Sequence, residues 1–151
     1  MASSAEKLQR LEAAGQLKPE ATSKQEIEGF LASARELLTD SQNSQLSAAS
    51  RFRLAYDAAY ALAHAALRAH GLRPSQEKGH RAIVFQCLAH TVGAAPDIWA
   101  TLSKAHSRRN ASVYGGLIDV SKSEAEDLVA TTARLSALVK SWLNKHRPDL
   151  R

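Results

Sequence analysis

The sequence predicts an all-α protein, a four- to five-helix up-down bundle with a short extra helix at its N-terminus. Apolar residues recur three and four positions apart in most segments, which is typical of amphipathic helices. Ser-x-x-Glu capping boxes precede two of these segments. No segment alternates apolar and polar residues as a half-buried strand would. The length of 151 residues suits a single domain.

The N-terminal part is expected to hold a short helix and then a long one. Residues 4–15 form the short helix, which is capped at Ser4 and belongs to an N-terminal appendage of residues 1–22. The main bundle then begins at the capping box Ser23-x-x-Glu26. Apolar residues follow this box on one face, so an amphipathic helix is predicted.

The middle of the chain predicts three further helices. Residues 46–71 form the central one, because ten of residues 46–70 are alanine and small side chains let neighbouring helices approach closely on several sides. A shorter helix is expected up to Gly93. The next begins near Pro96, which suits a first helical turn, and ends at the glycine pair 115–116.

The last helix begins at a second capping box, Ser121-x-x-Glu124, and ends before Pro148. The helical bundle is therefore assigned to residues 23–147, and residues 148–151 form a C-terminal tail.

Positive charge is concentrated in the middle of the chain. Residues 1–45 hold five Lys/Arg and seven Asp/Glu, residues 46–116 hold nine and three, and residues 117–151 hold six and five. The net charges are −2, +6 and +1. A basic centre between near-neutral flanks indicates an anionic partner, although solvated arginines on a surface give the same pattern.

Other features of the composition narrow the class of protein. No apolar run approaches the roughly 20 residues of a membrane span, and the N-terminus lacks the apolar centre of a signal peptide, so a cytoplasmic protein without a membrane partner is expected. The one cysteine, Cys87, stands in an apolar segment, which favours a buried thiol over a nucleophile. The histidines are not at metal-ligand spacing, so neither a metal nor a cofactor is expected.

The segment HSRRNASVYGG, residues 106–116, holds the candidate site. His106, Asn110 and Tyr114 are four residues apart, so they form one row about 12 Å long on a helix, with Arg109 beside it and Arg108 next to that. Arginine can grip phosphate oxygens, an amide can hold a sugar or base edge, and a phenol or imidazole can stack or exchange a proton. The alternative is a polar helix end, in which the arginines complement the helix dipole.

Asp57 is a candidate supporting residue. It is the only acid between Asp40 and Glu77, and Arg53 stands one helical turn before it. Asp57 either forms half of a surface ion pair with Arg53 or orients an arginine of the 106–114 row across the bundle.

Residues 23 to about 145 resemble the HEPN domain, a helical nucleotide-binding domain of higher eukaryotes and prokaryotes. The resemblance rests on RRNASVYGG near a helix end, on the alanine-rich segment before it and on GHRAIVFQCLAHTVG. The family motif is an Arg, usually followed by a polar residue, with a His five positions after the Arg. Arg109 and Asn110 match the first two positions, whereas Tyr114 replaces the histidine.

The resemblance implies a homodimer in which two motifs face one cleft. In active members this cleft is a metal-independent ribonuclease, often of a toxin–antitoxin or defence system. A tyrosine is a poor base at neutral pH, so we expect binding of RNA or a nucleotide through Arg108, Arg109, Asn110 and Tyr114, with weak or no cleavage.

Two alternatives remain open. The first is an active endoribonuclease, with Arg109 stabilising the phosphorane and Tyr114 or His106 transferring protons. The second is a helical adaptor or regulatory subunit that binds a cognate protein partner.

Overall fold

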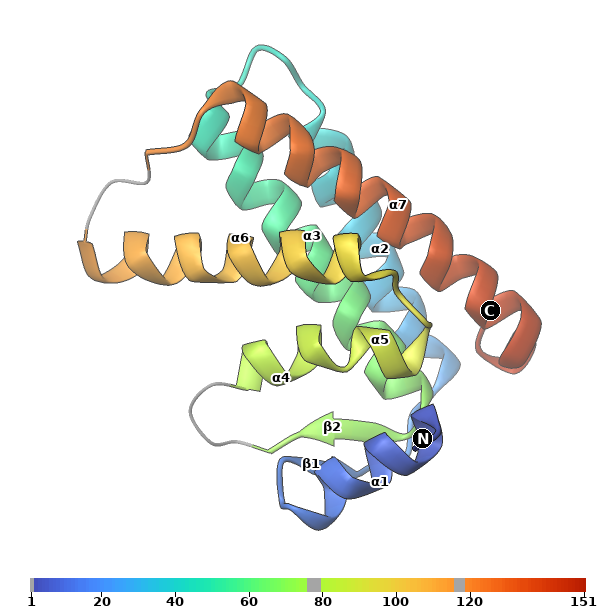
Figure 1. Cartoon of the computed structure of the whole chain (residues 1–151). Coiled ribbons are helices and arrows are strands. Elements are labelled where there is room, and N and C mark those ends of the chain that lie inside the picture. The colour runs from blue at the N-terminus through green and yellow to red at the C-terminus, as the bar shows by residue number, and fades with distance from the viewer. Residues whose placement is uncertain (1, 76–79, 116–118) are drawn as a thin grey trace.

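The computed structural model describes residues 2–75, 80–115 and 119–151, without the side chains of residues 80 and 112–115 (Figure 1). Helix accounts for 75% of the structure and strand for 4%, which confirms the all-α class. None of the described helices combines the length and the apolar character that crossing a membrane requires. In chain order the elements are α1 (Ser4–Ala13), β1 (Leu17–Pro19), α2 (Lys24–Ser41), α3 (Ala48–Ala69), β2 (Leu72–Pro74), α4 (His80–Gln86), α5 (Leu88–Thr91), α6 (Pro96–Gly115), α7 (Lys122–His146) and the 3₁₀ turn η1 (Pro148–Leu150).

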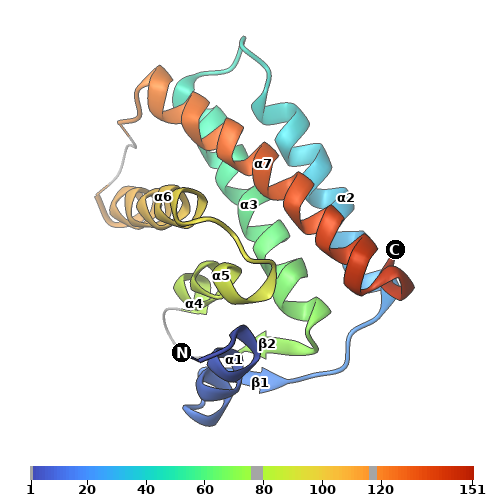
Figure 2. The same ribbon diagram turned by 45° about the vertical axis from the view of Figure 1, so that its right-hand side comes forward.

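Helix α3 runs through the centre, and α2 and α7 pack along it (Figures 1 and 2). Helix α6 runs across α3 and contacts both α3 and α7. It lies in the plane of the view in Figure 1 and is seen almost end-on in Figure 2. Helices α4 and α5 lie between α6 and a small sheet. The bundle therefore consists of three long helices side by side, α2, α3 and α7, and a fourth, α6, that crosses α3.

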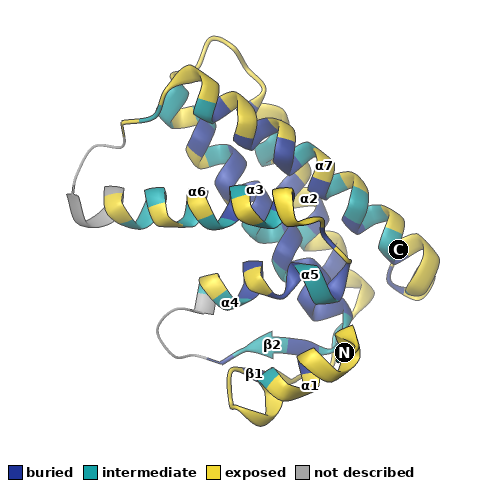
Figure 3. Ribbon diagram, viewed as in Figure 1, coloured by how far each residue is buried: buried dark blue, intermediate teal, exposed yellow. Residues whose placement is uncertain are grey.

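Alanine makes this central position possible. Figure 3 shows α3 as the most continuously buried helix, with neighbours on several sides. Its fully buried side chains are mostly small, and those under 2% exposed are Ala55, Tyr56, Ala58, Ala59, Leu62, Ala63, Ala65, Ala66, Leu67 and Ala69. Small side chains allow close approach of the backbones, so the sequence prediction of a central helix is confirmed.

The predicted helix starts are confirmed except for the first. The hydroxyls of Ser23 and Ser121 each accept a hydrogen bond from the backbone N–H three residues later, at 3.1 and 3.0 Å. The cap of α1 is Ser3 and not Ser4, because the Ser3 hydroxyl accepts from the N–H of Glu6. The sequence SSAE offers two serines, and the one three residues before the glutamate completes the capping pattern.

The prediction that the chain has no strand is wrong for two three-residue segments. Strands β1 and β2 pair antiparallel, with Leu17 opposite Pro74 and Pro19 opposite Leu72. Segments this short are too brief to show alternation, and each ends in a proline. Because of this pairing, the described part of the N-terminal segment, residues 2–22, packs onto the bundle, and Leu8 and Leu17 are buried in its core.

The helix expected up to Gly93 is divided at Cys87 into α4 and α5. The thiol of Cys87 is fully buried, and burial raises its pKa to about 11. It therefore stays protonated at neutral pH, as a core thiol does. The C-terminal tail also joins the core, because Leu150 of η1 is buried.

Arg68, near the end of α3, joins three parts of the chain. Its side chain is 3% exposed and donates to both carboxylate oxygens of Glu26, at 2.6 and 3.1 Å. It also donates to the carbonyl oxygens of Glu20, Ala21 and Leu72. Arg68 thus fixes the start of α2 and both sheet segments against α3, so this part of the basic centre has a structural role.

We predict that Glu26→Gln destabilises the fold by about 1–3 kcal/mol, because the buried guanidinium of Arg68 loses the nearer of its two carboxylate partners and keeps only Glu20, at 3.4 Å. The hydrogen bonds from Arg68 lower the pKa of Glu26 below its ordinary 4.5. The ionised carboxylate of Glu26 therefore contributes its full stabilisation of the fold above about pH 4.5. This stabilisation is lost as the pH falls through the lowered pKa of Glu26. Urea unfolding followed by circular dichroism measures both effects.

The matched control is Glu28→Gln on the same helix. Glu28 pairs with Lys24 at 3.9 Å, and both side chains are more than half exposed, so its removal should cost no more than about 0.5 kcal/mol. If Glu26→Gln and Glu28→Gln lower the free energy of unfolding by the same amount, the structural role of Arg68 is contradicted.

Candidate functional site

Two tyrosines stand among the alanines of α3, one helical turn apart. Tyr56 is 1% exposed and Tyr60 is partly buried. The Phe85 ring of α4 packs against both, with centroids 5.6 Å from that of Tyr56 and 5.9 Å from that of Tyr60. These three rings form the floor of the candidate site, which we call the aromatic floor.

His106 of α6 lies against this floor with both ring nitrogens engaged. Its Nδ1 is 3.0 Å from the Tyr56 hydroxyl, and its Nε2 is 3.2 Å from Nδ2 of Asn110. Burial lowers the pKa of His106, and the charges of Arg109 and Arg81 lower it further. The imidazole is therefore neutral at pH 7. The tautomer that lets Nε2 accept from the Asn110 amide carries its proton on Nδ1, next to the Tyr56 hydroxyl.

Two arginines from different helices approach the same rings. The guanidinium of Arg109 on α6 lies 5.7 Å from the Tyr56 ring centroid. That of Arg81 on α4 lies 4.2 Å from the Tyr60 centroid and 5.8 Å from that of Tyr56. These distances permit cation–π attraction, which holds both cations over the aromatic floor.

Neither arginine is neutralised within the described part of the chain. Arg81 and Arg109 form no ion pair there, and Nη1 of Arg81 is buried without a hydrogen-bond partner. A buried donor without a partner is costly unless a ligand or water satisfies it. Two cations beside a neutral histidine therefore form a site suited to an anion.

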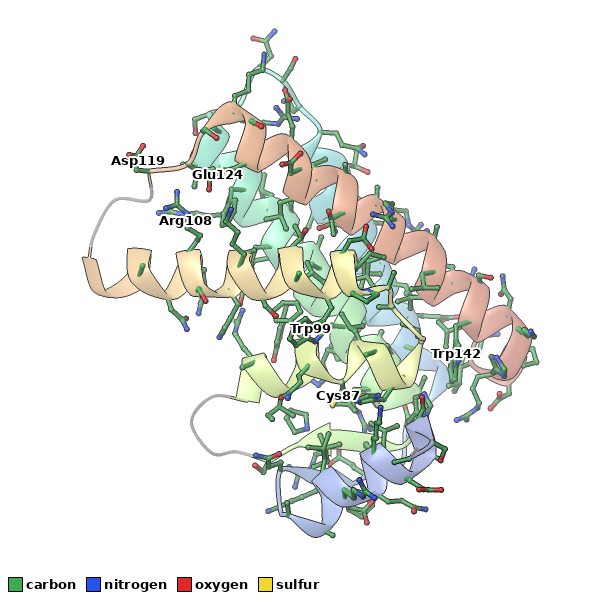
Figure 4. All side chains as sticks on the ribbon, in the orientation of Figure 1. Cys87, Trp99, Arg108, Asp119, Glu124 and Trp142 are labelled. Atoms are coloured by element: carbon green, nitrogen blue, oxygen red, sulfur yellow. The ribbon has the colours of Figure 1, made fainter. Side chains whose placement is uncertain are left out.

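Arg108 is directed elsewhere, as Figure 4 shows. Its guanidinium lies 3.2 Å from a carboxylate oxygen of Glu124 and donates to the carbonyl oxygen of Asp119. These contacts join α6 to the start of α7. A pocket of about 330 Å³ adjoins this pair. Its two arginines, Arg108 and Arg134, already have carboxylate partners in Glu124 and Asp97. Of the two adjacent arginines, Arg109 alone faces the aromatic floor.

The structure brings together three of the residues proposed from the sequence, His106, Arg109 and Asn110. Tyr114 belongs to α6, but its side chain lies outside the described residues. Arg53 and Asp57 are exposed on α3, and in the described ranges they form an ion pair neither with each other nor with another residue.

Sequence reasoning missed Arg81, Tyr56, Tyr60 and Phe85. The tyrosines did carry a signal, because two large amphipathic side chains stand four residues apart on a helix of small ones. Arg81 carried none, since its place beside α6 depends on how α4 packs against α6 and α3.

Among the described residues, no group of three or more His, Cys, Asp or Glu side chains could hold a metal ion. No protein-family model matches the sequence, and comparisons with curated proteins and with solved structures give no significant match.

Proposed function

We propose that this protein binds RNA or a nucleotide at the aromatic floor, with Arg81 and Arg109 contacting phosphate and Asn110 contacting a sugar or base edge. The observation that carries the proposal is the pair of arginines over Tyr56 and Tyr60, which have no carboxylate partner among the described residues. Guanidinium groups match phosphate geometry, and aromatic side chains beside them are typical of RNA sites. The resemblance to the HEPN motif at Arg109 and Asn110 supports the same ligand class.

The resemblance also implies membership of a prokaryotic toxin–antitoxin or defence system. A homodimer and a cognate protein partner stay predictions from the sequence. A protein without affinity for RNA at low salt would favour the adaptor alternative instead.

We predict that Arg109→Ala weakens RNA binding by about ten- to a hundredfold, because a charge-assisted contact of roughly 1.5–3 kcal/mol is lost. The slope of the logarithm of the binding constant against the logarithm of the salt concentration should become shallower by about one, the value for one lost phosphate contact. Fluorescence anisotropy with a labelled RNA oligonucleotide at several salt concentrations measures both quantities.

Arg108→Ala is the matched control, since it removes the same charge one residue away. Arg108 is held by Glu124, so its loss should change RNA affinity by less than about threefold, and its effect should fall mainly on stability, by roughly 0–1 kcal/mol. Equal losses of affinity from the two variants would indicate diffuse charge attraction and contradict a site at Arg109.

A second candidate function is slow cleavage of the bound RNA. The neutral imidazole of His106 lies beside Arg109, so it could take the proton of a 2′-hydroxyl while the arginine stabilises charge on the phosphorus oxygens. The 2′-oxygen would bond to phosphorus to give a cyclic phosphate, the bond from phosphorus to the 5′-oxygen would break, and that oxygen would take a proton from water. Both ring nitrogens of His106 are already hydrogen-bonded, which favours weak cleavage.

We predict that Tyr114→His raises RNA cleavage in EDTA by roughly a hundredfold, because it places a group with a pKa near neutrality at the motif position. Adding Arg109→Ala should abolish the gain. Gel analysis of end-labelled RNA measures it. If both the unmodified protein and Tyr114→His bind RNA but leave it intact, the cleavage candidate is wrong and the binding proposal stands.

A further inference from the structure

A small pocket adjoins the aromatic floor. It has a volume of about 250 Å³ and lies between α4 and α6. This volume is below the roughly 300–1,000 Å³ of pockets for drug-sized ligands, so a single ring system is the more suitable occupant. Its lining residues are Ala82, Phe85, Gln86, Trp99, Ser103, His106 and Ser107.

The pocket combines stacking surfaces with hydrogen-bonding groups. The half-buried Trp99 supplies the aromatic ring on which a base can stack, whereas Phe85 is 1% exposed and forms part of the wall. The hydroxyls of Ser103 and Ser107 and the amide of Gln86 supply donors and acceptors. Flat aromatic surfaces together with polar groups for the ring edge are how proteins bind unpaired bases.

Trp99 is available for stacking, whereas the other tryptophan of the chain is not. Trp142 stacks on His70 with centroids 4.7 Å apart and lies 5.0 Å from His146. Trp99 is half-buried and has no ring partner in the part of the chain that the structure describes. Figure 4 shows the two indoles on α6 and α7, well apart.

Two residues connect the pocket to the arginines. His106 lines the pocket and is bonded to Tyr56, over which Arg109 lies. Phe85 also lines the pocket and packs against Tyr60, over which Arg81 lies. Neither Arg81 nor Arg109 lines the pocket itself, so a base bound there and a phosphate bound at the arginine pair would share His106 and Phe85 as neighbours.

We propose that the pocket of Trp99 and Phe85 is a base subsite, so that the ligand is single-stranded RNA with one unpaired base inserted beside His106. This proposal rests on the RNA-binding function proposed above. A base held in a duplex is stacked and paired, and it cannot enter the pocket without being displaced from the helix.

Tryptophan fluorescence tests the subsite directly. In Trp142→Phe, Trp99 is the remaining tryptophan of the chain, and its emission should be quenched by a single-stranded RNA decamer but not by the same decamer in a duplex. A decamer with abasic positions should bind about five- to a hundredfold more weakly, because a stacked base contributes roughly 1–3 kcal/mol.

Trp99→Ala should weaken binding of the decamer to a similar extent, whereas Trp142→Phe is the matched control and should leave affinity unchanged. If the circular dichroism spectrum shows that Trp99→Ala is misfolded, its affinity is not informative. The quenching and abasic-RNA measurements in Trp142→Phe then decide whether the subsite exists. Quenching by a nucleoside monophosphate that competes with the decamer would support the subsite and identify a free nucleotide as a second source of the base.

Two results would overturn the inference in distinguishable ways. If Trp99 emission is unchanged and the abasic decamer binds normally, while Arg109→Ala still weakens binding, the RNA is held through phosphates alone. The base subsite is then wrong and the proposed function stands. If no RNA binds to the unmodified protein at low salt, both proposals fall together.

Discussion

The fold depends on the burial of α3 on nearly all sides, which its alanines allow. Helices α2 and α7 pack along it, and α4, α5 and α6 also contact it. A large side chain on such a helix displaces a neighbour unless that neighbour provides space for it. At Tyr56 and Tyr60 the space comes from Phe85 of α4 and His106 of α6. The position of these two helices is therefore coupled to the two tyrosines.

The chemistry of the site follows from this packing. The buried hydroxyl of Tyr56 requires a hydrogen-bond partner and finds it in His106. The tyrosine faces attract guanidinium groups, and Arg81 and Arg109 take these positions without a carboxylate partner in the described part of the chain. Burial and the two cations together keep His106 neutral. An anion is the one component that would complete this arrangement of charges.

The sequence was sufficient for the features that depend on local patterns. Helix starts at Ser23 and Ser121 follow from capping boxes, and the row of His106 and Asn110 follows from helical spacing. Features that depend on contacts distant in sequence were not predictable in this way. Strands β1 and β2 meet across more than fifty residues, and Arg81 reaches the site only through helix packing. Nor could the sequence distinguish the roles of the adjacent Arg108 and Arg109. The structure does so, because Glu124 pairs with Arg108 and Tyr56 lies beneath Arg109.

The central claim is that a phosphate binds between Arg81 and Arg109, and the pKa of His106 reports on it most directly. An NMR titration of the His106 imidazole should give a pKa below the ordinary 6.5 in the free protein. Saturating single-stranded RNA should raise this pKa, because phosphate charge offsets the two arginines. RNA affinity should then increase as the pH falls through this range. A free-protein pKa at or above 6.5, or one that saturating RNA leaves unchanged, would contradict the account.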